Sequence, residues 1–382
     1  MAELLFSTSA FAPQDRPIIG VPMLIDAQMR LIEPACAWLL HIALVRGRTR
    51  SSQTWRTYGE ALHDWWQTLE ANHWVWDQVT SDAAAAWRNR MLFEPSSVTG
   101  RPYARSTINL RLRTVAQFYR WHIARGQIDR SPFLLTELAA PVSNRPTPAP
   151  FSHRRQAHVT LELVVGQKST LPQPLMSHEI QRVFAQLGVR DRLMAEWAIL
   201  AGLRRMEVAG LTLRALPRAP SSSMEVPMVP IRLTNTKGDR LRVVYPPLAL
   251  IDRTLAYTRE ERLVATRRAR TRDAAYRDPD RVFLSARGTP ISVQRVGATF
   301  KNAAQRAGVD VSFHTLRHTF AAAMLRALQR QSARHPDMNP LLTLQVMLGH
   351  ANITTTQIYL RAVAADLDLV EAAVADLYPA LQ

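Results

Sequence analysis

A proline-rich stretch in the middle of the chain most constrains what this sequence can fold into. Residues 139–158 read AAPVSNRPTPAPFSHRRQAH, without apolar periodicity. Proline fixes φ and lacks the N–H that a helix or a strand ladder needs. We interpret the stretch as a linker between two domains, and a length of 382 residues fits that number. It therefore separates a domain over residues 26–138 from one over residues 159–382.

The residues before the linker predict a short arm and a helical domain. Residues 1–25 indicate an N-terminal arm, because Pro13, Pro17 and Pro22 interrupt any helix. Residues 26–138 follow helical spacing. A clear helix begins at Ser106 and closes near Gly126. Its tryptophan-rich neighbours predict core packing rather than stacking on exposed bases.

The region after the linker predicts further helices and a small sheet. Arg204 lies in a strongly apolar helical region, residues 193–213. Residues 228–233 and 241–245 alternate around Asn-Thr-Lys-Gly-Asp, which places Lys237 on a β-hairpin turn. The fold class is therefore mainly α with a small β-sheet.

Composition indicates a polyanionic partner. The formal net charge is +17 and the pI about 11.1, as in proteins that bind nucleic acid. Cys36 is the only cysteine, which excludes an internal disulfide and fits a reducing cytoplasm. The N-terminus lacks the features of a signal peptide, and no apolar run is long enough to span a bilayer. We expect no membrane partner.

Several short motifs follow one another in an order that suits phosphoryl transfer. Each piece alone has an ordinary structural explanation, such as a helix cap, a turn or a surface ion pair. Together they supply two arginines, a lysine, two histidines and a tyrosine. They are G-L-R at Arg204, T-K-G at Lys237, H-T-L-R at His314 and Arg317, L-G-H at His350, and T-T-T-Q-I-Y ending at Tyr359.

On these motifs the chain resembles the tyrosine recombinases of the phage integrase family. All six positions hold the residue types of the family's catalytic set: Arg204, Lys237, His314, Arg317, His350 and Tyr359. S-T-I-N, F-Y-R-W and G-x-I-D-x-x-P in residues 106–132 resemble its N-terminal part. The resemblance implies a helical, SAM-like core-binding domain followed by an integrase-type catalytic domain that ends in a docking helix.

The resemblance also implies a function and its partners. The expected reaction is site-specific DNA recombination that integrates or excises a mobile element. The partners would be duplex DNA with inverted-repeat core sites, other copies of this chain and accessory DNA-binding proteins. Free monomers or dimers would form a tetramer in synapsis. Type IB topoisomerase-like relaxation and non-catalytic DNA binding remain alternatives. We expect the work to be done in the cytoplasm, at the nucleoid.

The residue types suit a reaction without metal or cofactor. Arg204 and Arg317 would clamp the phosphate oxygens, because a guanidinium is planar and stays charged. Tyr359 would attack the phosphorus, with His314 as candidate base and nearby positive charge lowering the pKa of the phenol. Lys237 would protonate the leaving 5′-oxygen. His350 would bond or buttress the phosphate.

Four further parts of the sequence carry expectations. Glu207 should orient Arg204, and His318 should pack structurally beneath the site. Residues 329–338 read as a loop inserted before a helix that restarts at Asn339-Pro340. After Arg361 the chain is acidic and amphipathic, so residues 363–381 should dock on a neighbouring protomer.

Overall fold

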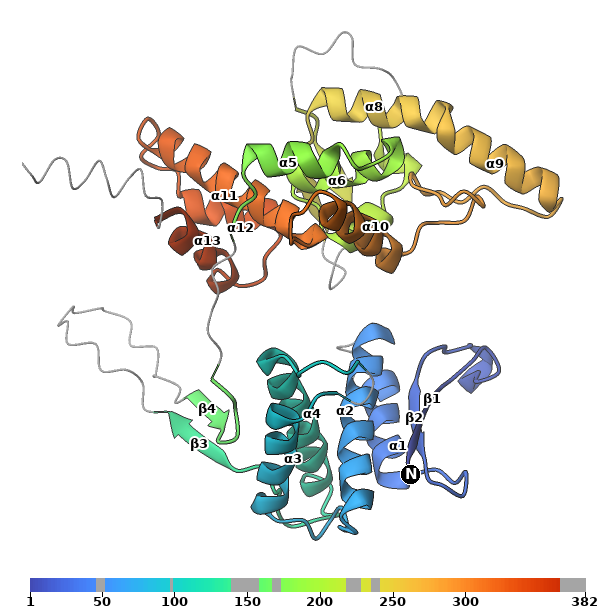
Figure 1. Ribbon diagram of the computed structural model, residues 1–382, viewed down its shortest axis with the longest axis vertical. Helices are drawn as coiled ribbons and strands as arrows, with labels where there is room; N and C mark the ends of the chain where they lie inside the picture. The colour runs from blue at the N-terminus through green and yellow to red at the C-terminus, as the bar shows by residue number, and fades with distance from the viewer. Residues whose placement is uncertain are drawn as a thin grey trace, which may run out of the picture. The chain divides into compact units, whose positions relative to one another are not determined.

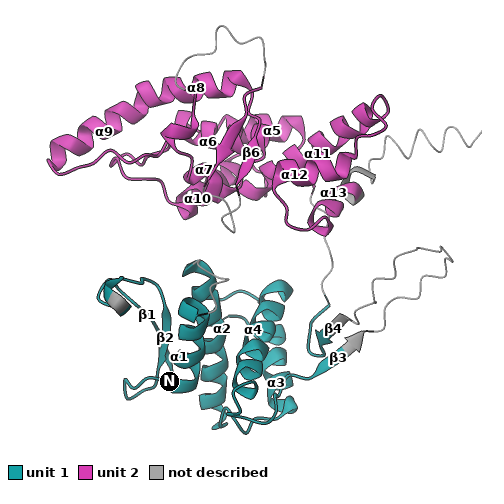
Figure 2. Ribbon diagram, turned by 180° about the vertical axis from the view of Figure 1, so that it is seen from behind, with its two compact units in different colours: residues 1–169 teal, residues 170–382 magenta. Residues whose placement is uncertain are grey.

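The described residues of the protein form two compact units. A computed structural model describes residues 1–45, 52–96, 99–138, 158–166, 173–217, 228–234 and 241–364. The chain divides into Met1–Ser169 and Thr170–Gln382 (Figures 1 and 2), which we call the first and the second unit. The described parts are mainly helical, with antiparallel two-stranded sheets, which confirms the predicted fold class.

The first unit is a helical bundle built on tryptophan. Its helices are α1 (Glu33–Leu40), which continues as a π-helical turn over His41–Val45, α2 (Ser52–Ala71), α3 (Ser81–Phe93) and α4 (Arg105–Ile123). Trp65 and Trp87 are fully buried between them. The Trp65 indole donates to the hydroxyl of buried Tyr119 at 3.2 Å, so its N–H is satisfied inside the core. The predicted packing role of Trp65 is confirmed.

The residues expected to form an arm pack onto this bundle instead. Strands β1 (Glu3–Phe6) and β2 (Pro22–Ile25) pair antiparallel, and a 3₁₀ turn, Pro13–Asp15, lies between them. A Cβ added at Gly59 of α2 would lie 2.5 Å from the Cβ of Pro22, so the hairpin rests directly on the helix. The prolines exclude a helix, as predicted, but Pro22 opens its strand, a position that proline tolerates.

The structure also moves the domain boundary. Strand β4 (His158–Leu161) pairs antiparallel with β3 (Leu135–Leu138), so chain on both sides of the proline-rich stretch belongs to the first unit. The Asn109 side chain on α4 exchanges two 2.8 Å hydrogen bonds with the backbone of Val165. The boundary between the units along the chain therefore lies between Ser169 and Thr170 rather than before residue 159. Residues 139–157 themselves lie outside the described residues.

The second unit contains the remaining helices and one short hairpin. Its helices are α5 (Ser177–Phe184), α6 (Val189–Ala201), α7 (Arg205–Ala209), α8 (Leu248–Arg259), α9 (Glu261–Arg272), α10 (Val293–Arg306), α11 (Phe313–Ser332), α12 (Pro340–Leu348) and α13 (Thr354–Ala364). A 3₁₀ turn spans Leu213–Ala215. Strands β5 (Ile231–Leu233) and β6 (Arg242–Val244) pair antiparallel, which confirms the predicted hairpin strands.

Helices α6 and α11 pack against each other at the centre of the second unit. On α6, buried Trp197 donates from its indole to the Thr254 hydroxyl at 3.0 Å and so ties α8 to the core. Helices α12 and α13 pack on α11, at the opposite end of the unit from α9 (Figures 1 and 2). This end holds the motif residues.

Of two smaller expectations, the first has an outcome. Helix α12 restarts as predicted: the Asn339 side chain accepts from the amides of Leu341 and Leu342, both at 3.1 Å. The docking segment falls mostly on residues 365–382, which lie outside the described residues. No helix within the described ranges is long and apolar enough to cross a membrane.

Candidate active site

Two glycines turn the chain at the places where motif residues are needed. Gly202 ends α6 and Gly349 ends α12, with φ of 66° and 61°. This left-handed conformation favours glycine. A Cβ at Gly202 would lie 2.6 Å from the ring of Phe320, so the space excludes a side chain as well. Each reversal presents the next motif residue, Arg204 or His350, beside the end of a helix.

Arg204 is fixed by its own turn of helix. It is the N-cap of α7, where Glu207 accepts from its backbone amide at 2.7 Å and from its guanidinium at 2.8 Å. A second guanidinium nitrogen donates to the Gly349 carbonyl at 3.1 Å. The Glu207 side chain is fully buried. The predicted orienting contact between Glu207 and Arg204 is therefore present.

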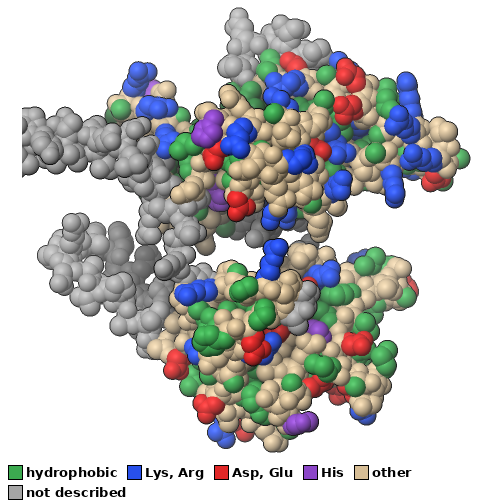
Figure 3. Space-filling model, viewed as in Figure 1, with side chains coloured by type: hydrophobic (Ala, Val, Ile, Leu, Met, Phe, Trp, Pro, Cys, Tyr) green, Lys and Arg blue, Asp and Glu red, His purple; other side chains and the backbone are tan. Residues whose placement is uncertain are grey.

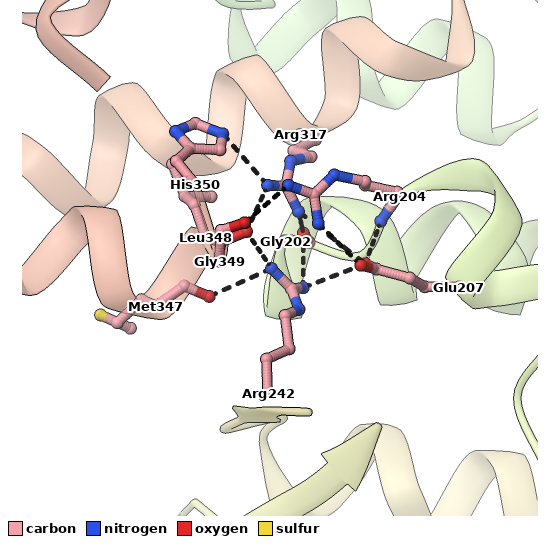
Figure 4. Close-up of polar contacts among 9 residues, drawn as sticks. All are labelled: Gly202, Arg204, Glu207, Arg242, Arg317, Met347, Leu348, Gly349 and His350. Atoms are coloured by element: carbon pink, nitrogen blue, oxygen red, sulfur yellow. Dashed lines mark hydrogen bonds and ion pairs between the residues drawn. The ribbon is translucent and has the colours of Figure 1, made fainter. Parts of the chain in front are cut away.

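Arg317 reaches the same point from α11, and its side chain is only 1% exposed. It donates to the Gly202 carbonyl, to the Leu348 carbonyl at 2.6 Å and toward His350 Nε2 at 3.3 Å (Figure 4). These bonds join the ends of α6 and α12. The structure thus brings Arg204, Arg317 and His350 together, as expected from the motifs.

A third arginine, which the sequence analysis missed, completes the cluster. Arg242 on β6 donates to the carbonyls of Gly202 and Met347 at 3.1 and 3.2 Å, and it lies 3.2 Å from a Glu207 oxygen (Figure 4). The sequence signal for Arg242 was its position on the strand. Residues two apart on a strand share a face, so Arg242 lies on the same face as Val244, which is buried. An arginine on the inward face of a hairpin needs an anionic partner.

The cluster holds more positive charge than its carboxylate neutralises. Three guanidinium groups face Glu207 at 2.8, 3.2 and 3.9 Å. Burial, followed by Arg242 and Arg204, lowers the pKa of Arg317 to about 9. Burial likewise lowers the pKa of Arg242 to about 10. Arg242 and Arg317 therefore remain charged at neutral pH, so an anion such as a phosphate would be strongly favoured here.

Main-chain dipoles supply part of the missing negative charge. The carbonyls that accept from these arginines belong to Gly202, Met347, Leu348 and Gly349. They lie at the C-terminal ends of α6 and α12, where the helix dipole is negative. Two helix ends therefore hold the guanidinium groups in place before any substrate arrives.

His350 is neutral and oriented. Its Nε2 lies 3.3 Å from an arginine nitrogen that can only donate, so its Nδ1 carries the proton toward the Thr356 hydroxyl at 3.0 Å. Burial, followed by Arg317 and Arg204, lowers the pKa of His350 to about 4. The ring can therefore exchange its Arg317 contact for another polar group.

Tyr359 lies close to this cluster but is bonded elsewhere. It is 2% exposed and packs with Phe320, Leu344 and Leu348. Its hydroxyl lies 2.9 Å from Nδ1 of His318, which was expected only to pack beneath the site. The expected lowering of its pKa is wrong: burial raises the pKa, and Arg317 and Arg204 oppose that rise without cancelling it.

Two predicted residues remain, His314 and Lys237. His314 meets His318 edge to face, with ring centroids 4.4 Å apart, so the described contacts link it to Tyr359 through His318. Lys237 lies outside the described residues, between the paired strands β5 and β6. In the described ranges no group of three or more His, Cys, Asp or Glu is arranged to hold a metal ion.

A groove opens beside the cluster, between β6 and α12. Its volume is about 1070 Å³. Arg204, Arg232, Arg242 and His350 line it together with apolar side chains such as Val346. An anion that entered this groove would meet the arginines directly.

Comparison with known proteins decides the family. The phage integrase family matches residues 173–365, about half of the chain, and the family's N-terminal SAM-like domain matches residues 37–126. This chain belongs to the phage integrase family. It is thus a tyrosine recombinase, an enzyme that breaks and rejoins DNA.

Relatives and solved structures agree with that family. Tyrosine recombinase XerC of Serratia marcescens is 28% identical over 287 residues, 75% of this chain and 76% of the relative. Tyrosine recombinase XerC 2 of Ralstonia nicotianae is 31% identical over 201 residues, 50% of this chain and 49% of the relative. The fold matches the crystal structure of the XerH site-specific recombinase bound to palindromic difH substrate. The TM-score is 0.56, with 17% identity, over 88% of this chain and 82% of that one.

Proposed function

We propose that this integrase-family enzyme recombines DNA at specific sites, through a 3′-phosphotyrosyl bond to Tyr359. The observation that carries the proposal is the arginine cluster, whose charges act on the buried Tyr359 phenol. Glu207 is the one carboxylate that pairs with these arginines within the described ranges. A phosphodiester gains negative charge as its phosphorus becomes pentacoordinate. Preorganised guanidinium groups stabilise that charge.

Each residue has a role in the proposal. Arg204 and Arg317 clamp the non-bridging oxygens. Arg242 helps to hold both in place, because it shares Glu207 with Arg204 and the Gly202 carbonyl with Arg317. His350 donates to a phosphate oxygen from Nε2 once DNA is bound, in the tautomer whose Nδ1 accepts from the Thr356 hydroxyl. Lys237 gives a proton to the 5′-oxygen that leaves. The phosphotyrosyl bond conserves the energy of the broken bond, so a second 5′-hydroxyl can reverse the step onto a new strand without ATP.

An exposed basic surface supports DNA as the partner. Arg267, Arg268, Arg270 and Arg272 on α9 are exposed, and no ion pair within the described ranges includes them. Lys and Arg side chains gather at this end of the second unit (Figure 3). Phosphates of duplex DNA would neutralise them with release of counterions, which makes affinity fall with salt.

The finer biology is part of the same proposal. We propose duplex DNA with inverted-repeat core sites as substrate and integration or excision of a mobile element as the task, carried out at the nucleoid. The acidic amphipathic segment 363–381 would dock on a neighbouring copy and so assemble a tetramer from monomers or dimers. Its deletion should then leave single-site DNA binding near normal while it abolishes cooperative assembly and strand exchange.

Covalent trapping on a nicked duplex tests the function. A nick just past the cleavage point releases a short fragment, so the protein–DNA adduct cannot reverse and survives denaturation. Wild type should form the adduct, and Tyr359→Phe should bind DNA normally and form none. An adduct with Tyr359→Phe contradicts the assignment. Supercoil relaxation without strand exchange would indicate a topoisomerase, and binding without an adduct a non-catalytic protein.

A further inference from the structure

The partner of the Tyr359 hydroxyl has no role in the reaction described so far. His318 Nδ1 lies 2.9 Å from that oxygen, and the two rings are 5.6 Å apart between centroids. Arg317 precedes His318 directly on α11, so one short segment supplies both a phosphate clamp and the nearest neighbour of the nucleophile. This juxtaposition joins two steps of the chemistry.

The hydrogen bond runs from the phenol to Nδ1 when His318 is neutral and carries its proton on Nε2. Burial, followed by His314 and Arg317, lowers the pKa of His318 to about 4. At neutral pH the ring therefore carries a single proton. Because burial also raises the pKa of Tyr359, the phenol keeps its own proton and donates it. A neutral imidazole nitrogen that accepts from a phenol is arranged as a general base.

His314 is less well placed for that task. It stands one helical turn earlier on the same face of α11 and meets His318 edge to face at 4.4 Å. The described contacts give it no hydrogen bond with the Tyr359 hydroxyl. It is a neighbour of the imidazole rather than of the phenol.

We propose that His318 Nδ1 takes the phenolic proton as Tyr359 attacks the DNA phosphorus. This inference rests on the proposed function. The Oη–P bond forms, the P–O5′ bond breaks, and the phenolic proton moves to His318 Nδ1. The leaving 5′-oxygen receives a separate proton, which we assign to Lys237. Rejoining runs the same transfers backward, and His318 returns its proton to the phenol.

The charges around His318 make its action as a base depend on bound DNA. An imidazolium at His318 would lie beside Arg317 in a cluster that is already positively charged. A phosphodiester in the clamp brings negative charge and offsets that cost. Proton transfer therefore becomes favourable only when DNA is bound, and the tyrosine stays protonated without it.

Matched asparagine variants test the assignment with full-length protein. His318→Asn keeps a polar atom near Nδ1 but cannot take a proton, and His314→Asn is the control. On the nicked duplex, His318→Asn should form adduct about 10²-fold or more slowly than wild type. Its DNA affinity should be unchanged, and the loss should exceed that of the control. A wild-type rate for His318→Asn, or a larger loss in His314→Asn, overturns the inference.

Two further measurements separate a base from a structural support. A difluorotyrosine at position 359 ionises more easily, so it should restore much of the rate to His318→Asn, which repair of packing would not do. A 5′-bridging phosphorothiolate substrate needs no acid for its leaving group. The defect of His318→Asn should persist on it, whereas that of Lys237→Ala should disappear. Failure of the difluorotyrosine to help, or rescue of His318→Asn by the phosphorothiolate, overturns the role.

The same gels distinguish this inference from the proposed function. If wild type forms no adduct, the recombinase proposal and this one fail together. If wild type forms it and Tyr359→Phe does not, the function stands and the rate of His318→Asn decides. Should His318→Asn fail to fold, difluorotyrosine in the otherwise wild-type chain still decides. With a base present, its easier ionisation should change the rate little, and a large acceleration overturns the inference.

Discussion

Each unit of this recombinase contains a carboxylate that holds arginines, and the two clusters differ in balance. In the first unit Asp64 accepts from the Trp87 indole and from Arg90, both at 2.8 Å, and lies 3.0 Å from Arg111. In the second unit Glu207 serves three arginines. The Asp64 cluster joins α2, α3 and α4 and has partly exposed arginines that water helps to solvate.

The Glu207 cluster lacks that relief. Arg242 and Arg317 are 5% and 1% exposed, and main-chain carbonyls take the place of water. Around Asp64 two arginines face one carboxylate and water shares the excess charge, whereas around Glu207 three arginines face one carboxylate and two of them are buried. The comparison indicates that a buried excess of positive charge, rather than the presence of a buried ion pair, distinguishes a site that awaits an anion.

Removal of the carboxylate should have the largest effect. Glu207→Gln leaves the buried guanidinium groups of Arg242 and Arg317, and the partly exposed one of Arg204, without a counter-charge. We therefore expect a loss of about 3–5 kcal/mol in the free energy of unfolding of the second unit. Asp64→Asn, the matched control, should cost the first unit less, because its arginines reach solvent. Urea unfolding of each variant, monitored through the proteolytic fragments that each unit yields, measures both losses of stability. Equal losses would remove the distinction between the clusters.

Replacement of the arginines should come next. Arg204→Lys and Arg317→Lys keep the charge but lose the fork that meets two phosphate oxygens. We expect adduct formation on the nicked duplex to slow by about 10²–10³-fold, with a smaller change in DNA affinity. Arg111→Lys in the Asp64 cluster should cleave at nearly the wild-type rate. A comparable loss there would show that the effect is one of general stability.

A fall in pH should lower the stability of the second unit moderately more than that of the first. His318 and His350 have pKa values near 4 in the folded state, against an ordinary value of 6.5. Between about pH 6.5 and 4 the unfolded chain binds more protons, so the free energy of unfolding falls as pH falls. Burial also lowers the pKa of His122 in the first unit, to a lesser extent. The urea midpoint of the second unit should fall more, and the double variant with asparagine at both positions should flatten that difference.

Chelation should have the smallest effect. If the arginine clamp does the work of divalent cations, adduct formation should continue at an unchanged rate in EDTA. The measurement is the nicked-duplex assay with EDTA, and again with excess Mg²⁺. Loss of cleavage in EDTA that Mg²⁺ restores would contradict the proposed chemistry.

The sequence predicted the residues of the site better than it predicted the neighbours and the burial that set their pKa values. Arg204, Arg317, His350 and Tyr359 lie in local motifs, so their types and order were readable, and the structure gathers them. Arg242 was missed because its role depends on strand register and on contacts with Met347, over 100 residues away. The raised pKa of Tyr359 follows from burial, which no local pattern shows.

The fold shows the same limit. The helices were readable from apolar spacing, since one face of each must be buried. The N-terminal hairpin was hidden by prolines that exclude helices but not strand ends. The domain boundary was misplaced because β4 pairs with β3, a contact across residues that the sequence favoured as a linker.

The carbonyls at the ends of α6 and α12 have a consequence for anyone who would move this site to another protein. Much of the negative charge that faces the arginines is main chain, so no list of side chains contains it. A graft of the motif residues alone would leave the guanidinium groups repelling one another. The transplant would need both helix ends, with Gly202 and Gly349 turning away from them. The essential part of this site is therefore the pair of helix ends at which the chain reverses, because their carbonyls hold the arginines in position.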